Sequence, residues 1–325
     1  MTQTAPFIIQ PTAESGTMPV VDDVYGLRVG IANVFFIGAR GTDRWILVDA
    51  GLHGTAGRIM RAAERLYGVG NGPSAIVLTH GHFDHVGALG TLLETWDVPV
   101  YAHDMELPYL TGRSAYPPPD PTVGGGLMAA LSRLYPRGPF DFSRSVQALP
   151  ADGAIPFAPG WRWVETPGHS PGHVSFFRAS DRTLIAGDAV VTTQQESMFA
   201  AVTQRPELHG PPMYFTPDWP AARESVQLLA ALQPEVLATG HGRPMRGARM
   251  RAELERLAEN FDRLAMPDSG RYVTEPTITD LSGVVHVPPP VADRLPKILL
   301  GIGAAAVLTF AARKVLADQG RRFMA

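Results

Sequence analysis

The segment His80-Gly81-His82-Phe83-Asp84-His85 constrains the chemistry and fold of this chain more than any other. It places four side chains that can bind a metal within six residues, and it holds three of the chain's 10 histidines. The apolar run at 75–79 just before it predicts a short buried strand. In an extended segment alternate side chains point to one side, so the first two histidines and the aspartate project together. Imidazole and carboxylate groups in this spacing indicate a site for zinc or a similar divalent metal.

Three more ligand-type side chains follow strand-like runs and stand beside glycine. They are His169, Asp188 and His241. The first stands in a loop rich in Gly and Pro, and the other two directly follow short apolar segments. Functional sites of α/β folds collect at strand ends. We therefore expect these side chains to join the histidine motif in one site.

Taken in order, these pieces resemble the metallo-β-lactamase superfamily. The matching residues are the His-x-His-x-Asp-His motif at 80–85, the Thr-Pro-Gly-His turn that ends at His169, then Asp188 and His241. The segment 46–51 is similar to the first strand and turn of that family. The resemblance spans residues 20–265. It implies an α/β fold, an αβ/βα sandwich of two mixed β-sheets flanked by helices, with a dinuclear site at one edge.

The resemblance also implies a role for each site residue. The first metal would be bound by His80, His82 and His169, the second by Asp84, His85 and His241, with Asp188 bridging the two. Zinc is the expected metal at both positions, with manganese or iron as alternatives. Asp84 and Asp188 would be catalytic, because they position the attacking hydroxide. Asp49 would orient a ligating imidazole from outside the ligand set.

Two metals that share a water lower its pKa toward neutrality, so the implied activity is hydrolysis without a Ser or Cys nucleophile. We expect cleavage of an ester, lactone or thioester bond of a small molecule. Val191 stands where acyl-homoserine lactonases often have Tyr, and Val86-Gly87-Ala88 departs from the Gly-Gly of glyoxalase II. The alternatives are a persulfide dioxygenase-like iron oxidoreductase, a phosphodiesterase and a non-catalytic metal-binding module.

Charge and cysteine content narrow the choice of partners. The 325 residues carry 28 basic and 31 acidic side chains, a net charge of -3, which gives no indication of a nucleic-acid partner. The chain has no Cys, which excludes disulfides and Cys-ligated zinc. The first residues lack a basic region followed by a long apolar stretch, so no secretory signal is evident and we expect a cytoplasmic location.

The expected organisation is an N-terminal arm at 1–19, a hydrolase domain at 20–265 and an extension at 266–325. Within the domain, the insert at 105–150 is rich in Pro and Gly and is expected to be irregular, which makes it a candidate lid. A second segment, 190–219, provides Phe199 and Tyr214 as candidate cleft-lining residues. The main expected helices are 56–67, 86–96, 221–232 and 249–264.

The extension contains a predicted apolar helix at 295–317. Its uncharged stretch, 298–312, covers roughly 22 Å at a helical rise, short of the ~30 Å hydrocarbon core of a bilayer. We expect it to be buried or to form a homo-oligomer, with peripheral membrane attachment as the alternative.

Overall fold

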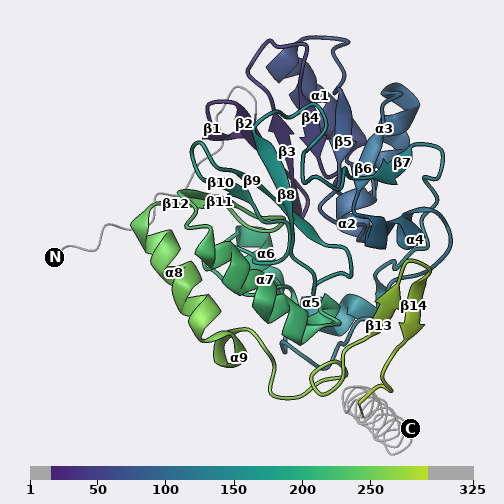
Figure 1. Ribbon diagram of the computed structural model, residues 1–325, viewed down its shortest axis with the longest axis vertical. Helices are drawn as coiled ribbons and strands as arrows, with labels where there is room; N and C mark the ends of the chain where they lie inside the picture. Colours follow the sequence, from purple (N-terminus) through teal and green to yellow (C-terminus); the bar gives the residue numbers. More distant parts are fainter. Residues whose placement is uncertain (1–15, 292–325) are drawn as a thin grey trace, which may run out of the picture. The chain divides into compact units, whose positions relative to one another are not determined.

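Two β-sheets pack face to face, and helices cover the outer face of each (Figure 1). The computed structural model describes residues 16–291. The first sheet has the strand order β1-β2-β3-β4-β5-β6-β7, and the second has the order β12-β11-β10-β9-β8. Each sheet contains both parallel and antiparallel pairs. The predicted αβ/βα sandwich of two mixed sheets is confirmed.

The first sheet changes from antiparallel to parallel pairing at β4. Strands β1 to β4 pair antiparallel with their neighbours, whereas β4 to β7 pair in parallel. Its strands are β1 (Met18–Val21), β2 (Val24–Val29), β3 (Ala32–Ile37), β4 (Ile46–Val48), β5 (Ala75–Val77), β6 (Val100–Ala102) and β7 (Val146–Ala148).

The second sheet has one parallel pair, β10 with β11, and is otherwise antiparallel. Its strands are β8 (Trp161–Glu165), β9 (Val174–Arg178), β10 (Thr183–Ile185), β11 (Val236–Ala238) and β12 (Met245–Arg246). The parallel pair matters for the site, because both strands end at the same edge and deliver their following residues side by side.

Alternation along the short strands divides the core into layers. Ile46 and Val48 of β4 pack between the two sheets with residues of β9 and β10, whereas Leu47 packs against helices on the outer face. A strand covered on both faces reads as a continuous apolar run rather than as an alternating one. Truncating Leu47 to Ala would cost about 2–5 kcal/mol, since the side chain is fully buried.

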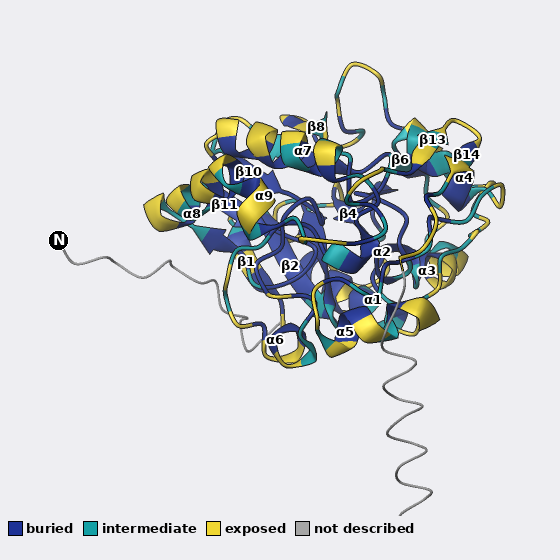
Figure 2. Cartoon of the chain, turned by 90° about the horizontal axis from the view of Figure 1, so that it is seen from below, coloured by how far each residue is buried: buried dark blue, intermediate teal, exposed yellow. Residues whose placement is uncertain are grey.

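The helices expose one face to solvent and bury the other against the sheets (Figure 2). Those packed on the first sheet include α1 and α3, and those on the second include α7, α8 and α9. The helices are α1 (Ala56–Tyr67), α2 (Phe83–Val86), α3 (Leu89–Thr95), α4 (Leu107–Leu110), α5 (Leu127–Leu131), α6 (Met198–Thr203), α7 (Trp219–Ala231), α8 (Ala248–Glu259) and α9 (Phe261–Leu264), with 3-10 turns η1 (Asp104–Glu106), η2 (Ser132–Leu134) and η3 (Met213–Phe215).

Two expected helices are interrupted. The predicted helix 86–96 is wrong in its extent, because α2 and α3 are separated at Gly87 and Ala88. A Cβ at Gly87 would lie 2.4 Å from the backbone N of His53, so the chain passes another backbone segment there too closely for a side chain. The predicted helix 249–264 likewise divides into α8 and α9 at Asn260, whose φ of -122° is not helical.

The insert at 105–150 is more regular than expected, and its end joins the sheet. It contains η1, α4, α5 and η2, and its last strand, β7, pairs in parallel with β6. The segment after α9 forms the hairpin β13 (Ile278–Asp280) and β14 (Gly283–His286). Ser114 of the insert accepts a hydrogen bond from the backbone N–H of Val284 at 3.1 Å, so this hairpin packs on the insert.

The ends of the chain differ from the expected division. Met18 and Pro19, placed in the N-terminal arm, belong to strand β1, and one compact unit extends to Pro289. The helix predicted at 295–317, with its proposed oligomer or membrane role, lies outside the described residues. Among residues 16–291, no helix has both the length and the apolar character needed to cross a bilayer.

Candidate metal centre

All seven predicted ligands come together at one edge of the sandwich. The histidine motif follows β5, His169 lies in the loop between β8 and β9, and Asp188 and His241 follow β10 and β11. The seven side chains are almost fully buried, with at most 7% of any residue exposed. Three groups of their ligand atoms each lie within 4.8 Å of one another: His80, His82 and His169; His80, His85 and Asp188; and Asp84, His85 and His241.

Asp188 occupies the centre of this cluster. Its Oδ2 atom lies 3.0 Å from Nε2 of His241, 3.5 Å from Nε2 of His85 and 3.5 Å from Nε2 of His169. On the two sides, Nδ1 of His82 lies 2.9 Å from Nε2 of His169, and Nε2 of His241 lies 3.4 Å from Oδ2 of Asp84. One carboxylate oxygen therefore reaches imidazole nitrogens of both groups.

Several buried polar atoms in the cluster lack a hydrogen-bond partner, as is expected of atoms that bind a metal. Nε2 of His80, Nε2 of His85 and Oδ1 of Asp188 are buried without a hydrogen-bond partner. Leaving a polar group buried and unpaired costs about 1–3 kcal/mol. A cation between them would give all three a partner, and nitrogen with carboxylate oxygen is a donor set that suits zinc and similar divalent metals.

The protonation of three imidazoles favours the same chemistry. Burial lowers the pKa of His80 and His169 well below the usual value and that of His82 to about 3, and the charge of neighbouring histidines lowers all three further. A neutral imidazole keeps the lone pair through which it binds a metal.

The other half of the cluster has charges that stabilise each other. Burial opposes charge on His85, but Asp188 and Asp49 outweigh it and raise the pKa of His85 well above its usual range. Burial would also raise the pKa of Asp188, yet His241 and His85 hold it well below its ordinary value. Asp188 is therefore a carboxylate, the form in which it can bind a metal.

Asp49 contacts His85 from outside the cluster. Its Oδ2 accepts hydrogen bonds from Nδ1 of His85 and Oγ1 of Thr79, both at 2.8 Å, while Oδ1 accepts from the Thr79 N–H at 2.8 Å. With Nδ1 donating, Nε2 of His85 is the nitrogen left for a metal. In the same way, Nδ1 of His241 donates to the Ile31 carbonyl at 2.9 Å.

His173 supports Asp188 from outside the cluster. Its Nε2 accepts the backbone N–H of Asp188 at 2.9 Å, and its Nδ1 lies 2.9 Å from Oγ1 of Thr166. A backbone N–H can only donate, so the proton of this neutral ring is on Nδ1. Burial lowers the pKa of His173 to about 4, which keeps the ring in this form.

Sequence reasoning missed Glu106, a buried carboxylate beside the cluster. It accepts hydrogen bonds from the two loops that carry His82 and His169, and from Tyr116. No local pattern marks it, because Glu106 lies in a short 3-10 turn within an insert that was expected to be irregular.

A small pocket of about 10 Å³, which is room for about one water molecule, lies beside His82 and His169. Apart from these two histidines its walls are aromatic or proline, and no Asp, Glu, Lys or Arg lines it. The other lining residues are Tyr116, Pro117, Pro118, Phe215, Pro217 and Tyr272. They come from the insert, from the segment after α6 and from the segment after α9, so three distant parts of the chain build one wall.

Asp120 joins these three parts. Its backbone N–H donates to the Tyr214 carbonyl at 2.8 Å, and its Oδ2 accepts the backbone N–H of Arg271. Beside it, the Tyr272 hydroxyl donates to the Pro118 carbonyl, and the Thr277 N–H donates to the Pro217 carbonyl at 3.0 Å.

The two predicted cleft-lining side chains do not line this pocket. Phe199 is 74% exposed on the outer side of α6, and Tyr214 is 3% exposed and packs with Tyr135 and Phe215. Within the segment 190–219, the ring of Phe215 contacts the site, since its centroid lies 4.8 Å from that of His82. The prediction failed because the six-residue helix α6 turns Phe199 outward, which the aromatic content of the segment could not indicate.

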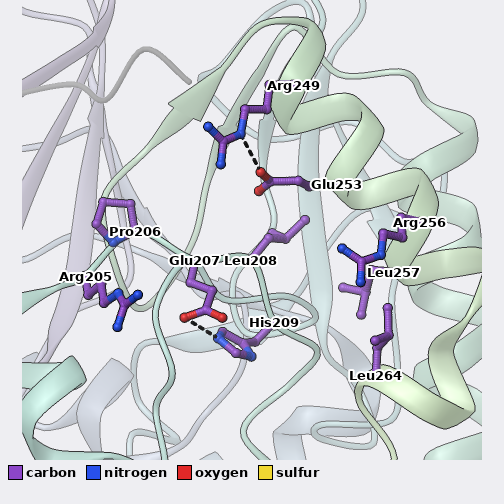
Figure 3. Close-up of a pocket in the computed structure, with 10 residues that line it drawn as sticks. All are labelled: Arg205, Pro206, Glu207, Leu208, His209, Arg249, Glu253, Arg256, Leu257 and Leu264. Carbon is purple, nitrogen blue, oxygen red and sulfur yellow. Dashed lines mark hydrogen bonds and ion pairs between the residues drawn. The ribbon is translucent and has the colours of Figure 1, made fainter. Parts of the chain in front are cut away.

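A larger pocket of about 420 Å³ lies between α8 and the segment 205–209 (Figure 3). It is lined by charged side chains, with Arg249 and Glu253 paired at 2.8 Å and Nε2 of His209 3.6 Å from Glu207. None of the seven clustered residues lines it, so it is separate from the candidate metal centre.

The fold and the cluster together define a metal-binding αβ/βα sandwich. The family model of the metallo-beta-lactamase superfamily matches residues 27–241. The probable metallo-hydrolase YflN of Bacillus subtilis (strain 168) is 52% identical over 239 residues, 73% of this chain and 90% of the relative. The probable metallo-hydrolase YybB of the same organism is 32% identical over 196 residues, 60% of this chain and 74% of the relative.

Among solved structures, the metallo-beta-lactamase family protein TTHA1429 from Thermus thermophilus superposes with a TM-score of 0.52. The identity is 21%, and the match covers 75% of this chain and 80% of that chain, which supports the fold alone. The chain belongs to the metallo-β-lactamase superfamily, whose members depend on metal ions.

Proposed function

We propose that this protein is a dinuclear-metal hydrolase that cleaves an ester, lactone or thioester bond of a small, uncharged molecule. The observation that carries the proposal is the position of Asp188, whose Oδ2 lies within 3.5 Å of imidazole nitrogens from both ligand groups. His80, His82 and His169 would hold one divalent ion, and Asp84, His85 and His241 the other, with Asp188 shared between them. Zinc is the proposed metal, since nitrogen and carboxylate ligands suit it.

Two bound divalent ions would supply a water of lowered pKa and polarise the scissile carbonyl. The chain's own residues would orient the water and the metal ligands. Asp84 and Asp188, both buried, would accept hydrogen bonds from the attacking water and fix its direction of approach. Asp49 and His173 hold the ligands in place, because each is paired with the side chain or backbone that it orients.

The apolar surface beside His82 and His169 supports an uncharged substrate, which would rest against these walls rather than fill the small pocket. Aromatic and proline surfaces bury acyl or ring carbons favourably, at about 25 cal/mol for each Å² removed from water. No Lys or Arg side chain lines that pocket, so a phosphodiester anion would be bound by the metal ions alone, which favours an uncharged substrate over the phosphodiesterase alternative. The small-molecule substrate and the absence of a nucleic-acid partner remain predictions.

Metal content and bond preference test the proposal together. Protein reconstituted with zinc is assayed against lactones, thioesters, aryl esters, phosphodiesters and β-lactams of similar size, while metal per chain is measured by atomic emission. We expect two zinc ions per chain and turnover of an uncharged acyl substrate. One iron per chain, with dioxygen consumed on a persulfide and no hydrolysis, would instead establish the oxidoreductase alternative.

A further inference from the structure

The Glu106 carboxylate ties together the two loops that supply His82 and His169. Its Oε2 accepts the Gly81 N–H at 2.9 Å, and its Oε1 accepts the Ser170 hydroxyl and the Gly172 N–H, both at 2.8 Å. Each contact lies one to three residues from a clustered histidine. Glu106 itself is 1% exposed and belongs to η1, outside both loops.

Every hydrogen-bond partner of Glu106 acts as a donor to its carboxylate. The two backbone N–H groups can only donate, and the hydroxyls of Ser170 and Tyr116 donate as well. The Tyr116 oxygen also accepts from the Gly81 N–H at 2.9 Å, so its own proton is committed to Glu106. An ionised carboxylate satisfies this arrangement, whereas an amide would turn an N–H₂ group toward donors on one side.

Tyr116 carries the connection to a ligand directly. Its ring centroid lies 4.6 Å from that of His82, in an edge-on contact, so the hydrogen bond to Glu106 also fixes the surface on which this imidazole rests. We do not assign Glu106 as a metal ligand, because both its carboxylate oxygens accept hydrogen bonds from the protein.

Two glycines allow the loops to come this close. A Cβ at Gly81 would lie 2.5 Å from the Tyr116 hydroxyl, and a Cβ at Gly172 would lie 2.8 Å from the backbone N of Glu106. The glycine inside the histidine motif and the glycine just before His173 are therefore explained by the approach of Glu106 and Tyr116, since neither glycine has a positive φ.

We propose that Glu106 is a positioning residue that sets the spacing of the His82 and His169 loops and so controls the affinity of the first metal position. The inference rests on the proposed metal centre and adds a residue that neither the motif nor the family match identifies. Gly81 and Ser170, which donate to Glu106, directly adjoin His80, His82 and His169 in the chain, whereas no donor to Glu106 among the described residues directly adjoins Asp84, His85 or His241, so we expect the effect to be selective for the first position.

The test is a cobalt(II) titration of the full chain, wild type and Glu106→Gln, followed by d–d absorption and by competition with a chelator. We expect wild type to bind two ions and Glu106→Gln to lose about 10–100-fold in affinity at one position, as for other residues that orient metal ligands. The absorption spectrum of the weakened position should change, and the other position should keep its affinity.

Glu165→Gln is the matched control, because it removes the same charge from an exposed side chain that precedes the same loop. Should Glu106→Gln not fold, Ser170→Ala removes a single donor to the carboxylate and should weaken the same position several-fold. Equal weakening of both positions, or binding like that of wild type, would overturn the positioning role. A wild type that binds no pair of ions would overturn the proposed function and this inference together.

Discussion

Nε2 of His173 accepts a 2.9 Å hydrogen bond from the backbone N–H of Asp188, the residue whose carboxylate lies between the two ligand groups. The bond fixes the turn after β10, where Gly187 has a φ of 53° and a Cβ would lie 2.5 Å from that same nitrogen. The neutral imidazole of His173, held by Thr166, thus orients the Asp188 carboxylate through the backbone and not by direct contact.

His173→Ala should therefore weaken both folding and turnover. A buried N–H without an acceptor costs about 1–3 kcal/mol, which urea unfolding would register as a lower midpoint. The loss of activity should appear as a lower kcat with little change in KM, because His173 does not line the pocket beside His82. His286→Ala, at an exposed histidine of β14, is the control and should change neither quantity. An unchanged unfolding midpoint would remove His173 from this role.

Asp188→Asn should abolish the proposed dinuclear centre without unfolding the chain. An amide cannot serve two cations as a shared anion, so we expect the metal content to drop to one ion or fewer per chain and hydrolysis to be lost. Metal analysis after gel filtration, with circular dichroism for the fold, measures both. Asp268→Asn is a suitable control at an exposed aspartate, and two ions retained in Asp188→Asn would contradict the bridging assignment.

Tyr272→Ala should change which acyl groups are cleaved rather than whether cleavage occurs. The ring, 2% exposed, forms part of the pocket wall, so its removal leaves room for a larger acyl group. We expect kcat/KM for bulky acyl esters to rise relative to small ones by about 10-fold, the scale of one hydrophobic group in a specificity pocket. Leu281→Ala, 58% exposed between β13 and β14, should leave the ratio unchanged.

A salt bridge distant from the site gives a pH-dependent prediction. Arg178 contacts Asp23 at 2.6 Å and Asp181 at 2.7 Å, joining β9 to the turn after β1. Burial alone would raise the pKa of Asp181, but hydrogen bonds from Arg178 and Thr183 hold it below the usual 3.8. Its stabilising effect is therefore present above pH 3.8 and is lost as the pH falls through the lowered pKa.

Arg178→Gln should accordingly destabilise the chain at neutral pH and lose that effect in acid. Because these side chains are partly exposed and screened, the difference should not exceed about 1 kcal/mol. Urea unfolding of both proteins at about pH 7 and near pH 3, on either side of the usual aspartate pKa, measures it. A gap that widens toward acid would show that the ion pair is not its source.

The ordered motif carried the prediction of the fold and of the metal cluster because ligand identity is local information. A histidine at a strand end is visible in the sequence, and Asp49 could be inferred from the same strand-and-turn pattern. The extent of the helices was less accessible, since the break at Gly87 depends on backbone near His53.

Long-range partners were not accessible at all. Glu106 reaches the cluster through contacts with residues 25 to 66 positions away, and nothing adjacent to it in the sequence marks a buried carboxylate. Phe199 was a wrong choice for the same kind of reason, because composition does not say which side of α6 faces solvent.

The hydrogen bonds of Asp120 have a consequence for how selectivity can change. This buried aspartate lies in the insert and is hydrogen-bonded to the segment after α6 and to the segment after α9. Each of the three segments contributes to the pocket wall. The sheets that present the clustered histidines are not part of that hydrogen-bonded group. Substitutions that are meant to change the substrate range should therefore be combined across the three segments. A substitution in one segment also shifts the backbone of the other two through their shared hydrogen bonds.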